Sequence, residues 1–183
     1  MQRFEGAMVF SYYHKLSAAQ KRCYQRSDAI AAVPLARADE LHSLIHDLEH
    51  ALAGEDRPRV EEICRNIAGG ITMRLSIPQL RIRVLAVRPA GNWGELHGLY
   101  EAAIGRASAV ITLWMRTVKH KRVVAFRSFL RTLLHELCHH IDYELFKLED
   151  SFHTEGFYKR ESSLFHQLSG GIQKNAKTAT DPS

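Results

Sequence analysis

Residues 133–143 read LLHELCHHIDY and contain the pattern H-E-x-x-H, formed by His135, Glu136 and His139. On an α-helix, residues four apart lie about 40° apart around the axis and about 6 Å along it, so both histidines can reach one ion. Glu136 lies about 100° around from His135, where its carboxylate can take a proton from a water on that ion without occupying a coordination position. The pattern therefore predicts a helix that binds zinc through His135 and His139, with Glu136 as the general base.

The residues around this motif add support, although with 11 histidines in the chain a motif of this length arises by chance in roughly one such chain in 20. Apolar side chains form a stripe centred about 90° around the helix from His135, which predicts that this side of the helix is buried in a core. The stripe consists of Leu134, Cys138, Ile141 and Leu145. His140 points about 140° away from His135 and is excluded as a ligand. The alternative is an ordinary helix whose histidines are hydrogen-bonded to their neighbours.

A catalytic zinc ion needs a third protein ligand and an open position for water. Three downstream residues have suitable chemistry: His153, Glu155 and Glu161. His153 is favoured because it stands at the start of a further predicted helix, FHTEGFYKR, from which it can point back across the loop. A neutral imidazole there completes a three-histidine site, and the two glutamates remain the alternatives.

HELCHH, followed fourteen residues after its second histidine by HTEGFYK, resembles the SprT-like, or Spartan-like, zinc metalloproteases. In that family a third histidine opens the next helix and an aromatic residue follows it, which is the position of Phe157 here. The resemblance covers about residues 36–168. It implies a minimal zincin domain with one catalytic Zn²⁺ held by His135, His139 and His153, and Glu136 as the catalytic residue.

The same resemblance implies proteolysis, which in the best-known members acts on proteins crosslinked to DNA. This chain departs from many SprT-like proteins because no cysteine zinc ribbon follows Cys138, and residues 1–35 match no part of the pattern. These departures do not affect the implied zinc chemistry. Because of them, the DNA-crosslinked substrate is not carried over to this chain.

Hydrophobic periodicity predicts an α+β fold, because helices come first, then strands, then helices. We expect helices at 36–53 and 54–75, strands at 80–88, 95–101 and 109–116 in a small, mainly antiparallel sheet, a long helix at about 123–148 that carries the motif, and a C-terminal helix over 157–168. The domain prediction is an N-terminal extension, packed or partly helical (1–35), a zincin-like metallopeptidase domain (36–168) and a disordered polar tail (169–183).

Composition bounds the class of protein. The three cysteines are widely spaced and form neither a disulfide framework nor a zinc ribbon, which favours a reducing compartment. The longest apolar run, AVITLWM, is far too short to cross a membrane. We therefore expect no membrane association and a cytoplasmic or nucleoid-associated location.

A basic run at residues 116–131, RTVKHKRVVAFRSFLR, contains no acidic residue and precedes the motif. Its first part holds Arg116, Lys119, Lys121 and Arg122. Such a run can bind phosphates without sequence preference, which allows weak nucleic-acid binding. The alternative, slightly favoured, is a solvated turn followed by an exposed helix face.

Three further residues are candidates for supporting roles. Asp142 follows His139 by three residues and can accept the free N–H of a ligand histidine, although a surface aspartate fits the pattern equally well. Tyr158 and Tyr143 are candidates to stabilise an oxyanion, with packing as the alternative for each. The segment GNWGELHGLY, residues 91–100, can provide an edge strand for an extended peptide.

The leading hypothesis is a zinc-dependent metallopeptidase that acts on a protein or peptide substrate. One alternative is a metal hydrolase that acts on a non-peptide amide. The other is a non-proteolytic, zinc-containing module that binds nucleic acid through the basic run.

Overall fold

The computed structural model describes residues 10–87, 98–117 and 121–170, which form five α-helices, two 3₁₀ helices and three strands. In chain order the elements are η1 (Ser11–Lys15), α1 (Ala18–Asp28), η2 (Ala38–Leu41), α2 (His42–Ala53), α3 (Arg57–Arg74), β1 (Arg81–Val87), β2 (Gly98–Glu101), β3 (Val110–Arg116), α4 (Phe126–Glu144) and α5 (Glu155–Ser169). The α+β class is confirmed. Lys119, residues 91–97 of the candidate edge-strand segment and residues 171–183 of the predicted tail lie outside the described residues.

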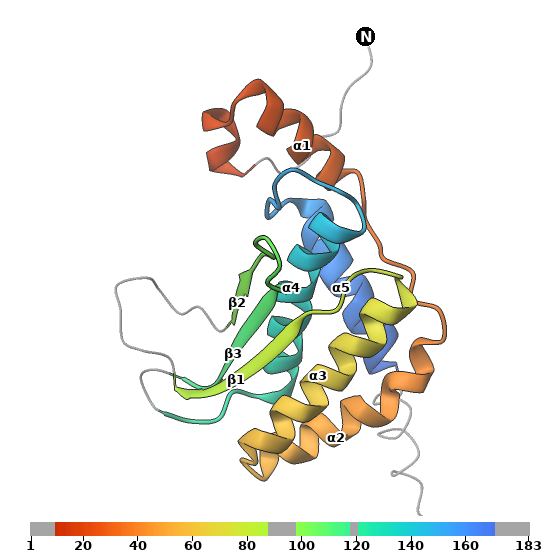
Figure 1. Cartoon of the computed structure of the whole chain (residues 1–183), viewed down its shortest axis with the longest axis vertical. Helices are drawn as coiled ribbons and strands as arrows, with labels where there is room; N and C mark the ends of the chain where they lie inside the picture. Colours follow the sequence, from red (N-terminus) through yellow and green to blue (C-terminus); the bar gives the residue numbers. More distant parts are fainter. Residues whose placement is uncertain (1–9, 88–97, 118–120, 171–183) are drawn as a thin grey trace, which may run out of the picture.

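The strands form one mixed sheet in the order β1-β3-β2 (Figure 1). β2 pairs antiparallel with β3, whereas β1 pairs parallel with β3, with Val84 opposite Leu113. The expectation of a mainly antiparallel sheet is therefore wrong for the longer of the two pairs. β3 takes the centre because every residue from Val110 to Met115 is buried, as a strand paired on both edges requires, whereas β1 alternates between exposed and buried residues.

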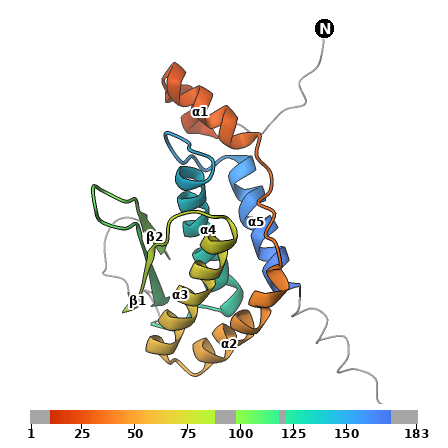
Figure 2. The ribbon, with the colours of Figure 1, turned by 45° about the vertical axis from the view of Figure 1, so that its right-hand side comes forward.

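Helix α4 is the centre of the molecule and lies between the sheet and α5 (Figures 1 and 2). The stripe predicted from the sequence faces the core, since Leu134, Cys138 and Ile141 are fully buried and Leu145 packs against the same cluster. Helices α2 and α3 complete that core, so the motif-bearing helix is anchored on one side and free to present its histidines on the other.

The motif helix is shorter than predicted at both ends. Val124 donates its backbone N–H to Met115 at 2.9 Å, and Val123 forms a bridge with Arg116, so this stretch is extended beside β3. At the other end, Leu148 donates its N–H to the Asp142 carbonyl at 3.0 Å and closes a turn. Backbone hydrogen bonds outside the helix thus set its limits.

Helix α5 begins at a threonine cap that fixes its entry. The Thr154 hydroxyl accepts the N–H of Phe157 at 3.0 Å, which satisfies one of the donors left free at a helix N-terminus. His153 stands immediately before this cap. The loop from α4 therefore delivers His153 to a fixed position beside the motif helix.

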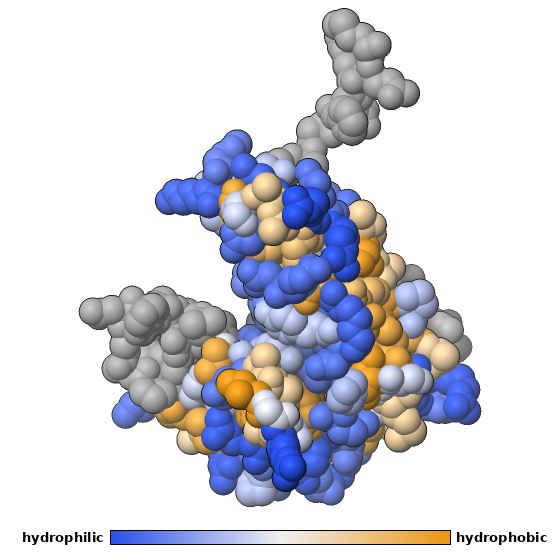
Figure 3. All heavy atoms as spheres, turned by 45° about the horizontal axis from the view of Figure 1, so that its top comes forward, coloured by the Kyte–Doolittle hydropathy of each residue, from blue (hydrophilic) through white to orange (hydrophobic). Residues whose placement is uncertain are grey.

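Residues 10–28 pack at one end of the molecule, where α1 lies against α5, and the following residues run alongside α5 toward α2, with the Leu35 N–H donating to Gln167 at 2.8 Å (Figure 1). Hydrophilic residues cover most of the face in Figure 3, and apolar residues gather along its right-hand flank. Among the helices of the described ranges, none is both long enough and apolar enough to cross a membrane.

Candidate metal centre

Three histidine side chains converge from two parts of the chain. His135 and His139 project from α4, and His153 reaches them from the loop before α5. The Nε2 atom of His153 lies 3.0 Å from Nε2 of His135 and 3.1 Å from Nε2 of His139. Nitrogens that bind zinc tetrahedrally at about 2.0–2.1 Å lie roughly 3.3 Å from one another. The three imidazoles therefore fit one tetrahedral metal ion.

Hydrogen bonds on the far side of two rings set their tautomers. His135 donates Nδ1–H to Glu161 Oε2 at 3.2 Å. His139 donates Nδ1–H to Ser151 Oγ at 2.7 Å, because that hydroxyl already donates its own proton to Asp142 Oδ2 at 2.8 Å. Both rings thus turn an unprotonated Nε2 toward the common point, which is the tautomer that a metal requires.

This arrangement refines two of the predicted roles. Asp142 does not meet a histidine directly; Ser151 stands between its carboxylate and His139. Glu161, an alternative third ligand, instead accepts hydrogen bonds from His135 and from Arg131, the latter at 3.0 Å. Glu155, the other alternative, pairs with Lys159 at 2.6 Å.

Burial keeps the imidazoles in the form that binds metal. Burial first, and then the neighbouring His135 and His153, lower the pKa of His139 to about 3. Burial followed by the charge of His135 also lowers the pKa of His153. A ligand histidine must be neutral, so both side chains are ready to bind at neutral pH.

Glu136 lies beside the histidines and is only 5% exposed. Burial raises the pKa of this carboxyl to about 7, while His135 and the backbone of Tyr100 act in the opposite direction. The carboxylate packs against β2 at Gly98, where a Cβ would lie only 2.6 Å from Glu136 Oε1. Because glycine has no Cβ, Gly98 leaves room for the Glu136 carboxylate.

The histidines and Glu136 open onto a pocket of about 260 Å³. Its lining comes from β2, α4 and the loop before α5, and consists of Gly98, Leu99, Tyr100, His135, Glu136, His139, Tyr143, Ser151 and His153. Strand β2 therefore forms one wall of the pocket, and the metal ligands form the other. Tyr143 belongs to this lining and Tyr158 does not.

Phe157 packs against all three histidines. It is fully buried, and its ring centroid lies 5.0, 4.8 and 5.1 Å from those of His135, His139 and His153. Tyr158, the oxyanion candidate, stacks on His153 with centroids 5.9 Å apart and is 41% exposed. Its ring thus covers one side of the third ligand.

His140 turns away from the cluster, as expected. It is buried, and its ring nitrogens contact the Pro78 carbonyl at 2.8 Å and the Tyr100 hydroxyl at 3.1 Å. Because Tyr100 lines the pocket, His140 fixes the wall opposite the metal ligands.

The basic run does not gather at the pocket. Arg116 forms an ion pair with Glu55 and donates to the Lys121 carbonyl at 3.0 Å, while Arg122 is exposed beside it. From the same run, Arg131 reaches the site, through its ion pair with Glu161. Arg116 ends β3, and Lys121 and Arg122 sit in the turn before α4, whereas His135 and His139 lie on α4 and His153 on the loop before α5.

The arrangement can hold a divalent metal ion and place one carboxylate beside it. Comparison of the chain with protein-family models, with curated proteins and with solved structures gives no match. The chemistry of the site is therefore inferred from the residues of the chain.

Proposed function

We propose that this protein is a zinc-dependent metallopeptidase of the kind that its motifs resemble, the SprT-like proteases. The observation that carries the proposal is the convergence of three Nε2 atoms next to Glu136 in one pocket. Three histidine ligands leave a fourth position for water, which is the arrangement of catalytic rather than structural zinc sites. His135, His139 and His153 would hold the ion.

The chain's own residues supply the rest of the chemistry. A zinc ion bound there would supply a water of lowered pKa and polarise the carbonyl of a substrate. Glu136 accepts the proton of the attacking water and then delivers it to the leaving amine. Glu161 and Ser151 hold the ligand rings while this occurs.

A peptide substrate is favoured over a small amide by the wall that β2 forms. Strand β2 is at the edge of the described sheet and lines the pocket, so an extended chain can pair with it. Two exposed apolar side chains, Leu99 and Tyr158, stand next to the histidines at 43% and 41% exposure. Leu99 lines the pocket and can therefore contact a substrate there.

Metal content and hydrolysis of an unfolded protein by the Glu136→Gln variant test the proposal. We expect one zinc ion per chain in wild type and variant, with hydrolysis at least about 100-fold slower in the variant because the general base is lost. Glu144→Gln on the same helix is the matched control, since Glu144 contacts Lys147 at 3.4 Å and not the metal ligands. A metal-free wild-type chain, or full activity in Glu136→Gln, would contradict the proposal.

The alternative of a nucleic-acid-binding module depends on the basic run. It has less support, because Arg116 is already paired with Glu55. Binding of a labelled single strand that weakens steeply with salt would favour it, in particular if Glu136→Gln binds as well as wild type.

A further inference from the structure

The loop that carries the third ligand is held by a distant part of the chain. We name residues 10–30, which comprise η1, α1 and the two residues after it, the N-terminal clamp. The clamp contacts most residues of the stretch 149–156. These contacts are Arg26 with Glu149 at 3.0 Å, Cys23 Sγ with the Asp150 carbonyl at 3.3 Å, the ring of Tyr12 on that of Phe152, Ser27 with Thr154 at 3.5 Å, and Asp28 with the Gly156 N–H at 2.9 Å.

One clamp residue contacts the ligand residue itself. The hydroxyl of Tyr12 donates to the carbonyl oxygen of His153 at 2.9 Å. Burial raises the pKa of Tyr12 to about 12, so this donor keeps its proton. The backbone of His153, the proposed third ligand, is thus hydrogen-bonded to η1.

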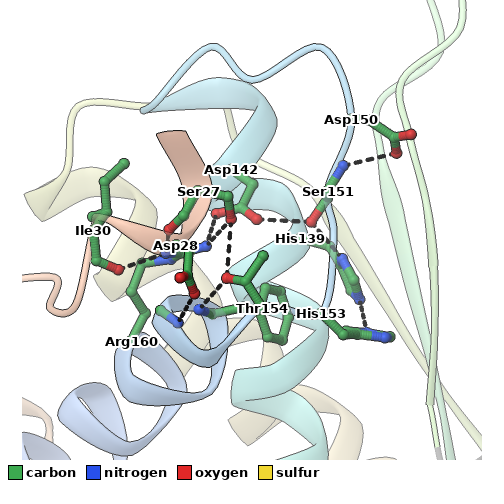
Figure 4. Close-up of polar contacts among 12 residues, drawn as sticks. Ser27, Asp28, Ile30, His139, Asp142, Asp150, Ser151, His153, Thr154 and Arg160 are labelled. Carbon is green, nitrogen blue, oxygen red and sulfur yellow. Dashed lines mark hydrogen bonds and ion pairs between the residues drawn. The ribbon is translucent and has the colours of Figure 1, made fainter. Parts of the chain in front are cut away.

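A second connection runs through a buried charge pair (Figure 4). Arg160 and Asp142 are both fully buried and lie 2.8 Å apart. Of the four hydrogen bonds that the Arg160 guanidinium makes, three go to the clamp: to the carbonyls of Ser27 and Ile30, each at 2.6 Å, and to the Ser27 hydroxyl at 2.9 Å. A buried guanidinium without such partners is strongly unfavourable.

The charge pair leads directly to a second ligand. One carboxylate oxygen of Asp142 accepts from Arg160, and the other accepts from Ser151, whose oxygen accepts from His139. A continuous chain of hydrogen bonds therefore joins the end of α1 to the ring of His139. The clamp contacts the metal centre twice, once at the backbone of His153 and once through Arg160.

From these contacts we infer that the N-terminal clamp sets the position of two metal ligands, with Tyr12, Arg160 and Ser151 as positioning residues. The inference rests on the proposed metal centre and adds to it a dependence on a segment outside the predicted catalytic domain. A loop held at many points loses less conformational freedom when it binds an ion, so the clamp raises metal affinity.

The first test compares Tyr12→Phe with Tyr13→Phe in the full chain. Both variants remove the hydroxyl of a half-buried tyrosine of η1, but that of Tyr13 contacts Gln25, at 3.2 Å, and not the loop. We expect Tyr12→Phe to bind Co²⁺ and Zn²⁺ about three- to tenfold more weakly, as loss of one hydrogen bond implies. Its Co²⁺ absorption spectrum, which reports ligand geometry, should also change. Tyr13→Phe should match wild type in both measurements.

The second test compares Ser151→Ala with Ser163→Ala. Each variant removes one half-buried hydroxyl, but Ser163 meets Gln167, at 3.2 Å, rather than a ligand. Since Ser151 holds the His139 ring, we expect a loss of roughly 10- to 100-fold in metal affinity for Ser151→Ala alone.

A third measurement needs no metal. Amide hydrogen exchange of residues 149–156 in the metal-free chain should be faster in Tyr12→Phe than in Tyr13→Phe, because one tie on the loop is lost. If both Tyr12→Phe and Ser151→Ala keep wild-type affinity, spectrum and exchange, the role of the clamp is refuted and the proposed function stands. If the wild-type chain binds no metal, the proposed function fails, and the ligand-positioning role fails with it.

Discussion

At the scale of single residues, Gly98 sets the space available to Glu136, the proposed general base. A Cβ at this position would lie 2.6 Å from Glu136 Oε1, 2.8 Å from Glu136 Cγ and 2.7 Å from Thr132 Cγ2. Carbon atoms do not approach so closely, so the Glu136 side chain would have to move. The position of the carboxylate therefore depends on a residue in a different element.

We predict that Gly98→Ala lowers hydrolysis at least about tenfold and leaves zinc content unchanged, since a misplaced base costs rate while the ligands are untouched. Peptidase assays and metal analysis of the same preparation measure both quantities. Gly69→Ala serves as the control, because the nearest atom to its added Cβ is 3.4 Å away on Gln79, and neither residue lines the pocket. Unchanged activity in Gly98→Ala would show that Glu136 adapts freely.

How far the site could be predicted also differs residue by residue. The relative positions of His135, Glu136 and His139 follow from helix geometry alone, because their spacing in the sequence fixes where they lie around the helix axis. Ser151 carries no such signal, since only the path of the loop brings it between Asp142 and His139. Arg160 does carry a signal: it stands three residues after Phe157 and four before Leu164, on the buried face of α5, where a charge needs a partner.

At the scale of elements, α3 contains two adjacent glycines with different surroundings. An added Cβ at Gly69 meets only the end of Gln79 at 3.4 Å, whereas one at Gly70 would lie 2.6 Å from Leu41 Cδ2. Both glycines weaken the helix in the same way, because glycine loses more backbone freedom on folding than alanine does.

We therefore predict that Gly69→Ala raises the free energy of unfolding by about 0.5–1 kcal/mol. In Gly70→Ala the same gain is offset by the overlap with Leu41, which costs about 1–3 kcal/mol in a packed core. Urea unfolding of the two variants and wild type measures the difference. Equal stability of the two variants would mean that Leu41 moves aside at little cost.

The sequence predicts most of the helices and strands, but it does not predict how the strands pair. Period and caps locate α3, α4 and α5 within a few residues, because these signals are local. The parallel pairing of β1 with β3 depends on which strand is buried at the centre of the sheet. The uninterrupted apolar run of β3 indicates that β3 is that strand.

At the scale of the whole molecule, the proposed metal centre would link metal binding to folding. The three ligands come from α4 and from the loop that joins it to α5, and an unfolded chain has no such site. A ligand at 100 times its dissociation constant stabilises the folded state by about 2.7 kcal/mol. In a chain of this size 1 kcal/mol corresponds to about 2–4 °C in melting temperature.

We predict that zinc at this excess raises the melting temperature by about 5–10 °C relative to chelator-treated protein. Scanning calorimetry measures the shift. His139→Ala should abolish it, whereas His140→Ala is a poor control because His140 is buried against Pro78. His46→Ala on α2 is a better one, and a shift that persists in His139→Ala would place the metal elsewhere.

The predicted domain boundary at residue 35 remains a prediction, yet it separates the N-terminal clamp from the loop that the clamp holds. Tyr12 and His153 stand 141 positions apart in the chain, and Ser27 and Arg160 stand 133 apart. A ribosome makes the clamp before it makes α5. The proposed metal centre therefore cannot be completed until His153 and Arg160 have been synthesised, so a nascent chain carries the HExxH helix before the residues that complete and hold the proposed site.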